Sequence, residues 1–394
     1  MSVVKPKRLG DLITFKRGYD LPEKDRVHGS YPVISSAGVS GCHNEFKAEG
    51  EGIVTGRYGT LGRMYYVDGK YWPHNTALYV KDFKGNDPLY IYYLLTCIGH
   101  ISTSDKSAVP GVNRNELHDM AVPAIEDKNI QIAVRQLLKS IDKKIELNNK
   151  INAELEAMAK LIYDYWFVQF DFPDTNDKPY KSSGGKMVFN EELKREIPDG
   201  WQVKKIKDIA STGSGGTPLK SKKEYYDNGN IPWINSGEVN EPFITQAKKF
   251  ITEFGVEKSS AKLFSRGTIL MAMYGATAGK VSFINFEATT NQAICAINPH
   301  DENYNFYLKF GLEDLYDYLV SLSSGSARDN LSQAKIKELM FSIPTDEWLG
   351  KYHLKVQPMM SKILSNMKEN NQLIALRDWL LPMLMNGQVT VKGD

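Results

Sequence analysis

The sequence has few cysteines and no long apolar run. Cys42, Cys97 and Cys295 lie far apart and form no C-x-x-C motif, which excludes a disulfide framework and a zinc knuckle, so we expect three reduced, buried thiols. No stretch of 18 apolar residues occurs, and the amino-terminal residues lack the apolar core of a secretion signal. We therefore expect a cytoplasmic protein.

An excess of charge of one sign is also missing. The 394 residues include 49 lysines and arginines against 47 acidic residues, a formal net charge of +2. This balance gives no sign of a nucleic-acid-binding chain, so if the chain binds DNA, local patches or partner subunits must supply the cationic surface. The length suggests two or three domains, and the apolar fraction of 42% is ordinary for globular proteins.

Catalytic motifs are absent from the sequence as well. GATAGKV at 275–281 has one residue too few between its glycines for a P-loop, and Val281 stands where a magnesium-binding serine or threonine is needed. NDPLY at 86–90 lacks the second proline of the Asn-Pro-Pro-Tyr loop of amino-methyltransferases. The histidines show no metal-binding spacing. We expect no catalytic residue, no metal and no cofactor bound by this chain.

A segment about half as long as the chain occurs twice in the sequence. RLGDLITFKRG at 8–18 matches KIKDIASTGSG at 205–215, and YPVISSAGV at 31–39 matches IPWINSGEV at 231–239. The Gly-rich loop in GRYGTLGRMYYV at 56–67 returns in AMYGATAGKVSF at 272–283, and the same offset places Asn75 on Asn291. Such a long repeat predicts two copies of one domain. Short strands between Gly-rich turns, with a smaller helical component, predict that this domain is α+β.

Each copy is followed by a long amphipathic helix. Apolar residues recur at alternating spacings of three and four, which is typical of a coiled-coil seam. A helix over 137–166 would be roughly 45 Å long. Asn148 and Asn370 occupy equivalent positions, where they either form a buried polar layer that sets register or lie on a solvated flank. The predicted helix seam consists of Leu138, Ile141, Ile145, Asn148, Leu155 and Ile162 in the first helix and Met360, Ile363, Met367, Asn370, Ile374, Leu381 and Leu384 in the second.

The predicted fold class is therefore α+β and internally duplicated, with two globular α/β domains separated by two long antiparallel coiled-coil-like helices. The expected parts are a first domain at 1–124, a central helix at 125–170, a linker rich in Pro, Gly and charge at 171–200, a second domain at 201–345, a carboxy-terminal helix at 346–387 and a tail at 388–394.

Four segments in order resemble the specificity (S) subunits of type I restriction-modification systems. They are LIYDYWFVQFDFP at 161–173, IPDGWQVKKIKDIA at 197–210, GGTP at 215–218 and LIALRDWLLPMLMNGQV at 373–389, and the resemblance covers essentially the full length. It implies a non-catalytic chain with two target recognition domains, each of which reads one half of an asymmetric, bipartite target in double-stranded DNA. The helices would set the half-site spacing and dock modification subunits.

The resemblance also implies the partners. Two modification subunits would carry S-adenosylmethionine and methylate adenine at N6, and two restriction subunits would use ATP and Mg²⁺ to cleave DNA. The cluster of Tyr163, Tyr165, Trp166 and Phe167 is then either an anchor for a modification subunit or the apolar junction between helix and domain. Two other functions stay open: a coiled-coil scaffold without DNA reading, and the specificity subunit of a related type II system with a bipartite site.

Residues that differ between the two copies are the candidates for base reading, because shared residues cannot encode two different half-sites. Arginine reads guanine edges, whereas lysine and tyrosine usually contact phosphates. The Gly-rich loop itself either approaches DNA or only turns a strand and packs its tyrosine. The predicted DNA-binding residues are Arg17, Arg57, Tyr58, Arg63 and Arg114 in the first copy and Lys220, Lys222, Lys223, Tyr274, Lys280 and Arg328 in the second.

Overall fold

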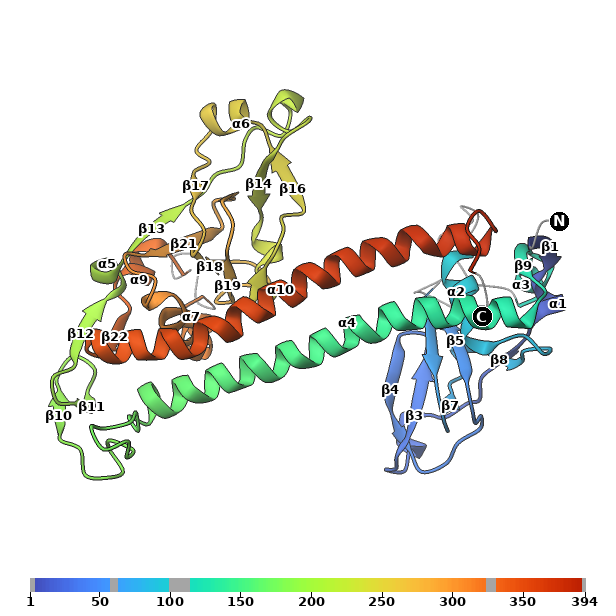
Figure 1. Ribbon diagram of the computed structural model, residues 1–394, viewed down its shortest axis with the longest axis horizontal. Helices are drawn as coiled ribbons and strands as arrows, with labels where there is room; N and C mark the ends of the chain where they lie inside the picture. Colours follow the sequence, from blue (N-terminus) through green and yellow to red (C-terminus); the bar gives the residue numbers. More distant parts are fainter. Residues whose placement is uncertain (1–3, 57–62, 99–113, 324–330, 392–394) are drawn as a thin grey trace. The chain divides into compact units, whose positions relative to one another are not determined.

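The protein forms two compact units (Figure 1). The structure is a computed structural model that describes residues 4–56, 63–98, 114–323 and 331–391. Unit 1 consists of residues 1–147 and 370–394, and unit 2 of residues 148–369. Each unit therefore holds one copy of the repeat together with a segment of each long helix, α4 (Lys128–Tyr163) and α10 (Asp346–Met385). Among the described residues, no helix is long and apolar enough to cross a bilayer.

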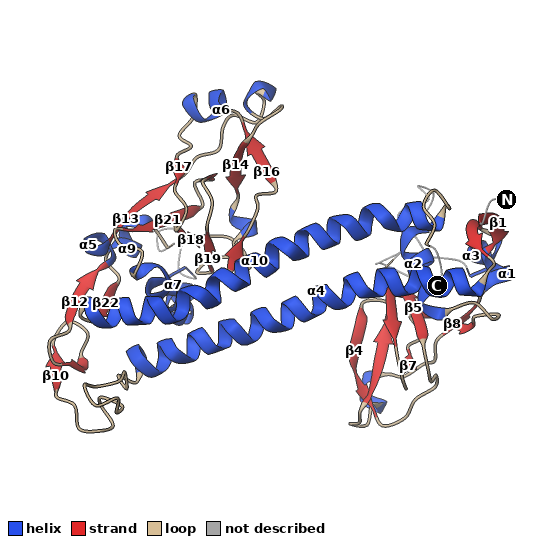
Figure 2. Ribbon diagram, viewed as in Figure 1, coloured by secondary structure: helices blue, strands red, loops and turns tan. Residues whose placement is uncertain are grey.

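Two small sheets form the body of unit 1 (Figure 2). The larger has the strand order β2-β8-β5-β6 with antiparallel neighbours, and the smaller the order β4-β3-β7. All residues of the central strand β5 are buried, as expected for a strand covered on both faces. The strands are β2 (Thr14–Arg17), β3 (Tyr31–Ser35), β4 (Gly38–His43), β5 (Gly52–Gly56), β6 (Met64–Val67), β7 (Trp72–Pro73) and β8 (Ala77–Asp82).

A separate strand pair closes unit 1. β1 (Val4–Arg8) pairs antiparallel with β9 (Ala121–Ile125). The helix that follows β1, α1 (Leu9–Leu12), packs against α3 (Arg114–Asp119), which precedes β9. The helix α2 (Pro88–Ile98), which follows β8, covers β5 and β6. The pairing brings the start of the unit beside the residues that lead into α4.

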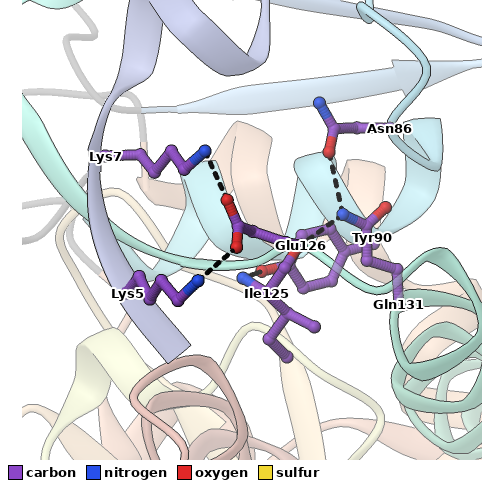
Figure 3. A network of polar contacts seen from close by, with 7 residues as sticks. All are labelled: Lys5, Lys7, Asn86, Tyr90, Ile125, Glu126 and Gln131. Atoms are coloured by element: carbon purple, nitrogen blue, oxygen red, sulfur yellow. Dashed lines mark hydrogen bonds and ion pairs between the residues drawn. The ribbon is translucent and has the colours of Figure 1, made fainter. Parts of the chain in front are cut away.

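A polar network attaches the first turn of α4 to unit 1 (Figure 3). The buried Gln131 side chain donates from Nε2 to Asn86 Oδ1 at 2.8 Å and to the Ile125 carbonyl at 2.7 Å. The Ile125 amide donates to the Tyr90 hydroxyl at 3.0 Å. On the exposed side, Lys5 and Lys7 both pair with the Glu126 carboxylate and lower its pKa to about 2. These bonds satisfy polar groups where a strand gives way to a helix.

The core of unit 1 is completed by the far end of the chain. Leu138 of α4 and Leu381, Leu384 and Met385 of α10 are buried in the same cluster as Tyr90 of α2. The carboxy-terminal helix thus supplies apolar residues to the amino-terminal unit.

Unit 2 repeats the plan of unit 1, which confirms the predicted duplicated α+β fold. Its sheets have the orders β13-β21-β18-β19-β15 and β16-β14-β20-β17, and β12 pairs with β22 as β1 pairs with β9. The strands are β12 (Gln202–Lys205), β13 (Ala210–Ser214), β14 (Ile231–Ile234), β15 (Phe243–Ile244), β16 (Lys249–Ile251), β17 (Leu263–Phe264), β18 (Ile269–Ala272), β19 (Val281–Ile284), β20 (Ala288–Thr290), β21 (Ile294–Pro299) and β22 (Met340–Ile343). The helices are α5 (Ile206–Ile209), α6 (Glu253–Glu257), α7 (Tyr304–Asp314), α8 (Tyr316–Ser323) and α9 (Gln333–Lys337).

Residues 171–200, expected to be a linker, are instead part of unit 2. They contain the hairpin β10 (Met187–Asn190) and β11 (Arg195–Pro198). Phe172 and Ile197 are buried in the core of the unit, where Phe172 stacks on Trp201 with 5.4 Å between ring centres. The apolar and aromatic side chains in this otherwise hydrophilic segment explain the difference, because their burial outweighs the turn-forming composition around them.

The aromatic cluster at the end of α4 belongs to the same core. Tyr163, Trp166 and Phe167 are buried, the last two in a π-helical turn at Asp164–Val168, whereas Tyr165 is exposed. Three of the four residues therefore form the junction between helix and domain.

The cysteine expectation is wrong at one position. Cys295 is buried and Cys97 half-buried, but Cys42 is exposed. Cys42 lies on β4, an edge strand whose middle residues all face solvent.

The seam positions of the two helices are mostly buried or half-buried in their units. Asn148 of unit 2 and Asn370 of unit 1 are only 1% and 6% exposed, so each is a buried polar residue of its own unit and not part of a solvated flank. Ile374 departs from the predicted pattern and is 37% exposed. In the remaining seam set, Leu138, Ile141, Met360, Ile363, Leu381 and Leu384 are buried, and Ile145, Leu155, Ile162 and Met367 are half-buried.

A buried lysine connects α7 to α4 within unit 2. Lys309 is fully buried, and its Nζ lies 2.8 Å from Glu313 Oε1 and 3.3 Å from Glu156 Oε1. Its ammonium group also lies 4.9 Å from the ring centre of Phe243. Burial raises the pKa of Glu313, and the nearby Lys309 opposes that rise.

We expect Lys309→Met to destabilise unit 2 by about 3 kcal/mol at pH 8, because it leaves the half-buried Glu313 carboxylate without its cation. A raised carboxyl pKa in the folded state favours folding below that pKa and penalises it above, so the loss should shrink towards pH 5. Urea unfolding followed by tryptophan fluorescence measures both effects. Lys186→Met, which removes an exposed partner of Asp199, should change stability by less than about 0.5 kcal/mol. An equal loss at both pH values would contradict this interpretation.

Candidate nucleic-acid interface

Three loops of unit 2 leave the larger sheet at one edge. In that sheet β21 lies between β13 and β18, with Ser214 opposite Cys295 and Ala272 opposite Ile294. The strands are antiparallel, so the end of β13, the start of β21 and the end of β18 coincide. Residues 215–217, 291–293 and 273–280 therefore gather at this edge. We call them the strand-end cluster of unit 2.

A glycine holds two of these loops in close contact. A Cβ atom on Gly215 would lie 1.9 Å from the Thr290 carbonyl oxygen. The next amide, of Gly216, donates to that same oxygen at 2.8 Å, and the Gly216 carbonyl accepts from Trp233 Nε1 at 3.0 Å. The chain therefore passes the Thr290 carbonyl, on its way from β13 to the smaller sheet, so closely that only glycine fits. We call this close passage the glycine crossing.

Unit 1 has the same crossing. A Cβ atom on Gly18 would lie 2.2 Å from the His74 carbonyl oxygen, and the Gly18 amide donates to the Ala77 carbonyl at 3.1 Å. Arg17 pairs with Leu78, and Gly56 with Ala77. The strand-end cluster of unit 1, residues 17–20 and 74–76, is therefore at the equivalent edge of its sheet.

Side chains bridge the two loops in both clusters, but with different chemistry. In unit 2 the Thr217 hydroxyl donates to Gln292 Oε1 at 2.7 Å. In unit 1 Asn75 Nδ2 donates to Asp20 Oδ1, and Asp20 aligns with Thr217 when the matched segments 8–18 and 205–215 are extended. A shared scaffold thus carries an acid and an amide in one unit and a hydroxyl and an amide in the other.

Arg17 joins the bridge of unit 1. Its Nε donates to the Asn75 carbonyl at 3.3 Å, and its Nη2 lies 4.0 Å from Asp20 Oδ1. More than half of the side chain is exposed. Arginine, asparagine and glutamine are the side chains that read base edges by paired hydrogen bonds, so both clusters present suitable groups.

The Gly-rich loop is the third component of the cluster in unit 2. Gly275 and Gly279 have φ values of 88° and 79°, and the Gly279 amide donates to the Ala272 carbonyl at 2.9 Å. Thr277 Oγ1 donates to the Ser236 carbonyl at 2.8 Å. Tyr274 is 41% exposed, so the loop does not pack its tyrosine into the core. Of the equivalent loop in unit 1, Arg57 and Tyr58 lie outside the described residues.

The other predicted residues are spread over both units. Lys220, Lys222 and Lys223 are exposed and follow the cluster of unit 2, and Lys222 lies 3.8 Å from Glu224. Lys280 is half-buried beside a cavity of about 280 Å³ that Glu313 and Tyr316 also line.

In unit 1, Arg63 is exposed with its guanidinium 5.6 Å from the ring centre of Tyr65, and Arg114 is exposed at the start of α3. Arg328 lies outside the described residues. The structure therefore brings Arg17, Tyr274 and Lys280 to the clusters. It leaves Arg63, Arg114 and the three exposed lysines as separate cations.

Side chains suited to metal binding do not gather in the described ranges, where no group of three or more His, Cys, Asp or Glu residues could hold an ion. The chemistry that the clusters offer is hydrogen bonding at the surface.

Comparison with known proteins gives the family. Residues 1–157 and 198–377 match the family model of the type I restriction modification DNA specificity domain. The chain belongs to this family. Two relatives are specificity subunits of type I restriction enzymes. The HindI subunit of Haemophilus influenzae is 28% identical over 341 residues, 73% of this chain and 73% of that protein. The MjaIX subunit of Methanocaldococcus jannaschii is 27% identical over 314 residues, 77% and 69% of the two chains.

A solved structure supports the fold. The S subunit of a type I restriction-modification system from M. genitalium superposes with a TM-score of 0.66 at 15% identity, over 99% of this chain and 96% of that chain. Membership of the type I specificity family makes DNA target recognition the function class of this chain.

Sequence reasoning missed four residues of the two bridges in this type I specificity chain: Asp20, Asn75, Thr217 and Gln292. It selected arginines, lysines and two tyrosines, whereas none of these four residues is a cation and three of them are uncharged. The signal was present, because Asn75 aligns with Asn291 and the next position differs, with Thr76 in the first copy and Gln292 in the second.

We expect Gly215→Ala to destabilise unit 2 by roughly 1–3 kcal/mol, because the new methyl group would overlap the Thr290 carbonyl and force the two loops apart. Gly350→Ala is the matched control: Gly350 lies in α10, a Cβ there meets nothing within 4 Å, and alanine should stabilise the helix by about 0.5–1 kcal/mol. Thermal unfolding of the purified chain compares them. Equal stability of the two variants would show that the crossing tolerates a side chain.

Proposed function

We propose that this chain is the non-catalytic DNA sequence-recognition subunit of a type I restriction-modification complex, and that units 1 and 2 each read one half of an asymmetric bipartite target. One observation carries the proposal: both strand-end clusters share the glycine crossing but present different hydrogen-bonding side chains. A duplicated scaffold with diverged readers suits two half-sites of different sequence.

The nearly neutral charge fits a shared interface. Phosphate contacts supply most of the affinity of proteins for DNA, and a net charge of +2 is small for that task. We propose that two modification subunits, which bind S-adenosylmethionine and methylate adenine at N6, supply many of these contacts. Two restriction subunits, which use ATP and Mg²⁺, would complete the endonuclease.

The long helices suit a spacer. α4 has 36 residues and α10 has 40, which correspond to roughly 54 and 60 Å, longer than the 34–36 Å or so of one DNA turn. Leu138 of α4 is buried in the core of unit 1 and Ala159 in that of unit 2. A change in helix length would thus change the chain distance between the readers, and we propose that the helices set the half-site spacing and dock the modification subunits.

We expect methylation of one bipartite motif, with an adenine in each half, when the chain is produced with its modification subunits in a host that lacks other adenine methyltransferases. Methylome sequencing identifies the motif. The same host without this chain should show no methylation at it, and the isolated chain with labelled S-adenosylmethionine and DNA should transfer no methyl group.

Two results would contradict the proposal. Methyl transfer by the isolated chain would make it an enzyme. Methylation by the modification subunits that stays the same when an unrelated chain replaces this one would leave only a scaffold role.

A further inference from the structure

We propose that the loop-to-loop bridge in each strand-end cluster carries the base-reading side chain of that unit: Gln292 reads an adenine for unit 2 and Arg17 reads a guanine for unit 1. This inference rests on the proposed function. It assigns base contacts to two particular residues.

Gln292 has a free hydrogen-bonding edge. The side chain is exposed, and Thr217 Oγ1 donates to its Oε1 at 2.7 Å. Among the described residues, Nε2 has no acceptor. An oxygen has two lone pairs, so the amide still offers one acceptor and two donor hydrogens side by side. This pairing of donor and acceptor matches N6 and N7 of adenine in the major groove.

The backbone around Gln292 is fixed on both sides. The Asn291 amide donates to the Ile234 carbonyl at 3.0 Å, and the Ala293 amide donates to Asn291 Oδ1 at 3.1 Å. The Ala293 carbonyl accepts from the Met273 amide at 2.8 Å, which connects this loop to the Gly-rich loop. With Thr217 holding the amide, little conformational freedom remains to be lost on binding.

In unit 1 the proposed reader, Arg17, comes from the loop at 17–20 and not from the loop at 74–76 that aligns with the loop of Gln292. Thr76, which aligns with Gln292, is already engaged: its hydroxyl lies 3.0 Å from His74 Nδ1 and accepts from the Ser36 amide at 3.3 Å. Arg17 uses Nε on the Asn75 carbonyl, which leaves the guanidinium end exposed beside Asp20. Two guanidinium donors match O6 and N7 of guanine.

The reverse holds in unit 2. Ser214 aligns with Arg17 but is short, and its hydroxyl donates to Gln333 Oε1 of α9 at 3.4 Å. In each unit, one of the two aligned positions carries a short side chain that bonds within the protein, and the other carries an exposed long side chain with hydrogen-bonding atoms left over. The position of the exposed long side chain differs between the two units. This arrangement gives two readers of different base preference on one scaffold.

The test is the methylation motif of the complete complex with single substitutions. Gln292→Ala should relax one A·T position in one half-site, with a loss of discrimination of roughly 5- to 150-fold at that base pair, and leave the other half unchanged. Arg17→Ala should relax one G·C position in the other half. Gln292→Glu should replace the adenine preference by cytosine, since a carboxylate accepts from cytosine N4. Gln357→Ala, an exposed glutamine on α10 of unit 2, is the matched control and should leave the motif intact.

The outcomes separate this inference from the function on which it rests. A wild-type complex without a bipartite motif would overturn the proposed function. A bipartite motif that Gln292→Ala and Arg17→Ala leave unchanged at every position would overturn only the assignment of readers.

If a variant abolishes methylation, the assignment is tested by competition binding. The purified complex is given duplexes that carry each base pair in turn at each half-site position. Selective loss of discrimination at one position supports the assignment. A uniform loss for all duplexes, such as misfolding would produce, overturns it.

Discussion

Burial of the apolar stripe on each long helix is the constraint on which both units depend. The core of unit 1 needs Leu381 and Leu384, which come from the end of the chain, and the core of unit 2 needs Ala159 and Tyr163, which come from the helix that follows the first copy. Each fully buried leucine contributes about 1.5–3 kcal/mol. Neither copy of the repeat therefore completes its core with its own residues alone, and each unit needs a segment of both long helices.

Polar pairs along the helices add register to this apolar attraction. In unit 2, Asn148 donates to Glu369 Oε2 at 2.8 Å and Asn366 to Asn152 Oδ1 at 2.9 Å; in unit 1, Arg377 donates to Asp142 Oδ1 at 2.9 Å. Leucine would pack more favourably at a buried seam position. A shift of one helix along the other, however, costs little where apolar residues pair, whereas it deprives a buried asparagine of its hydrogen-bond partner. The polar layers therefore select one alignment of α4 and α10 within each unit.

Features that depend on local period or on repetition were predictable from the sequence, and features that depend on long-range pairing were not. Alternating spacings of three and four identified Leu138 and Leu384, because a helix places such residues on one face. Residues 171–200 were predicted as a linker since composition does not reveal that Phe172 will meet Trp201. The grouping of loops in the strand-end clusters also escaped prediction, although Arg17 and Tyr274 were among the predicted residues. Gly18 and His74 are far apart in the sequence, and only the pairing of β2 with β8 brings their loops together.

In both strand-end clusters, the residues that shape the backbone and the residues proposed to read bases are subject to different structural constraints. A side chain at Gly18 or Gly215 would place its Cβ about 2 Å from a carbonyl oxygen and displace that group. Both units therefore require glycine at the crossing. Gln292 and Arg17 are exposed, and substitutions of exposed residues outside special backbone positions usually alter stability by less than about 0.5 kcal/mol. A new side chain at these positions alters what the surface can bond to without weakening the fold beneath it. Two copies that start identical can therefore diverge in the bases that they prefer while their cores, helices and crossings stay the same.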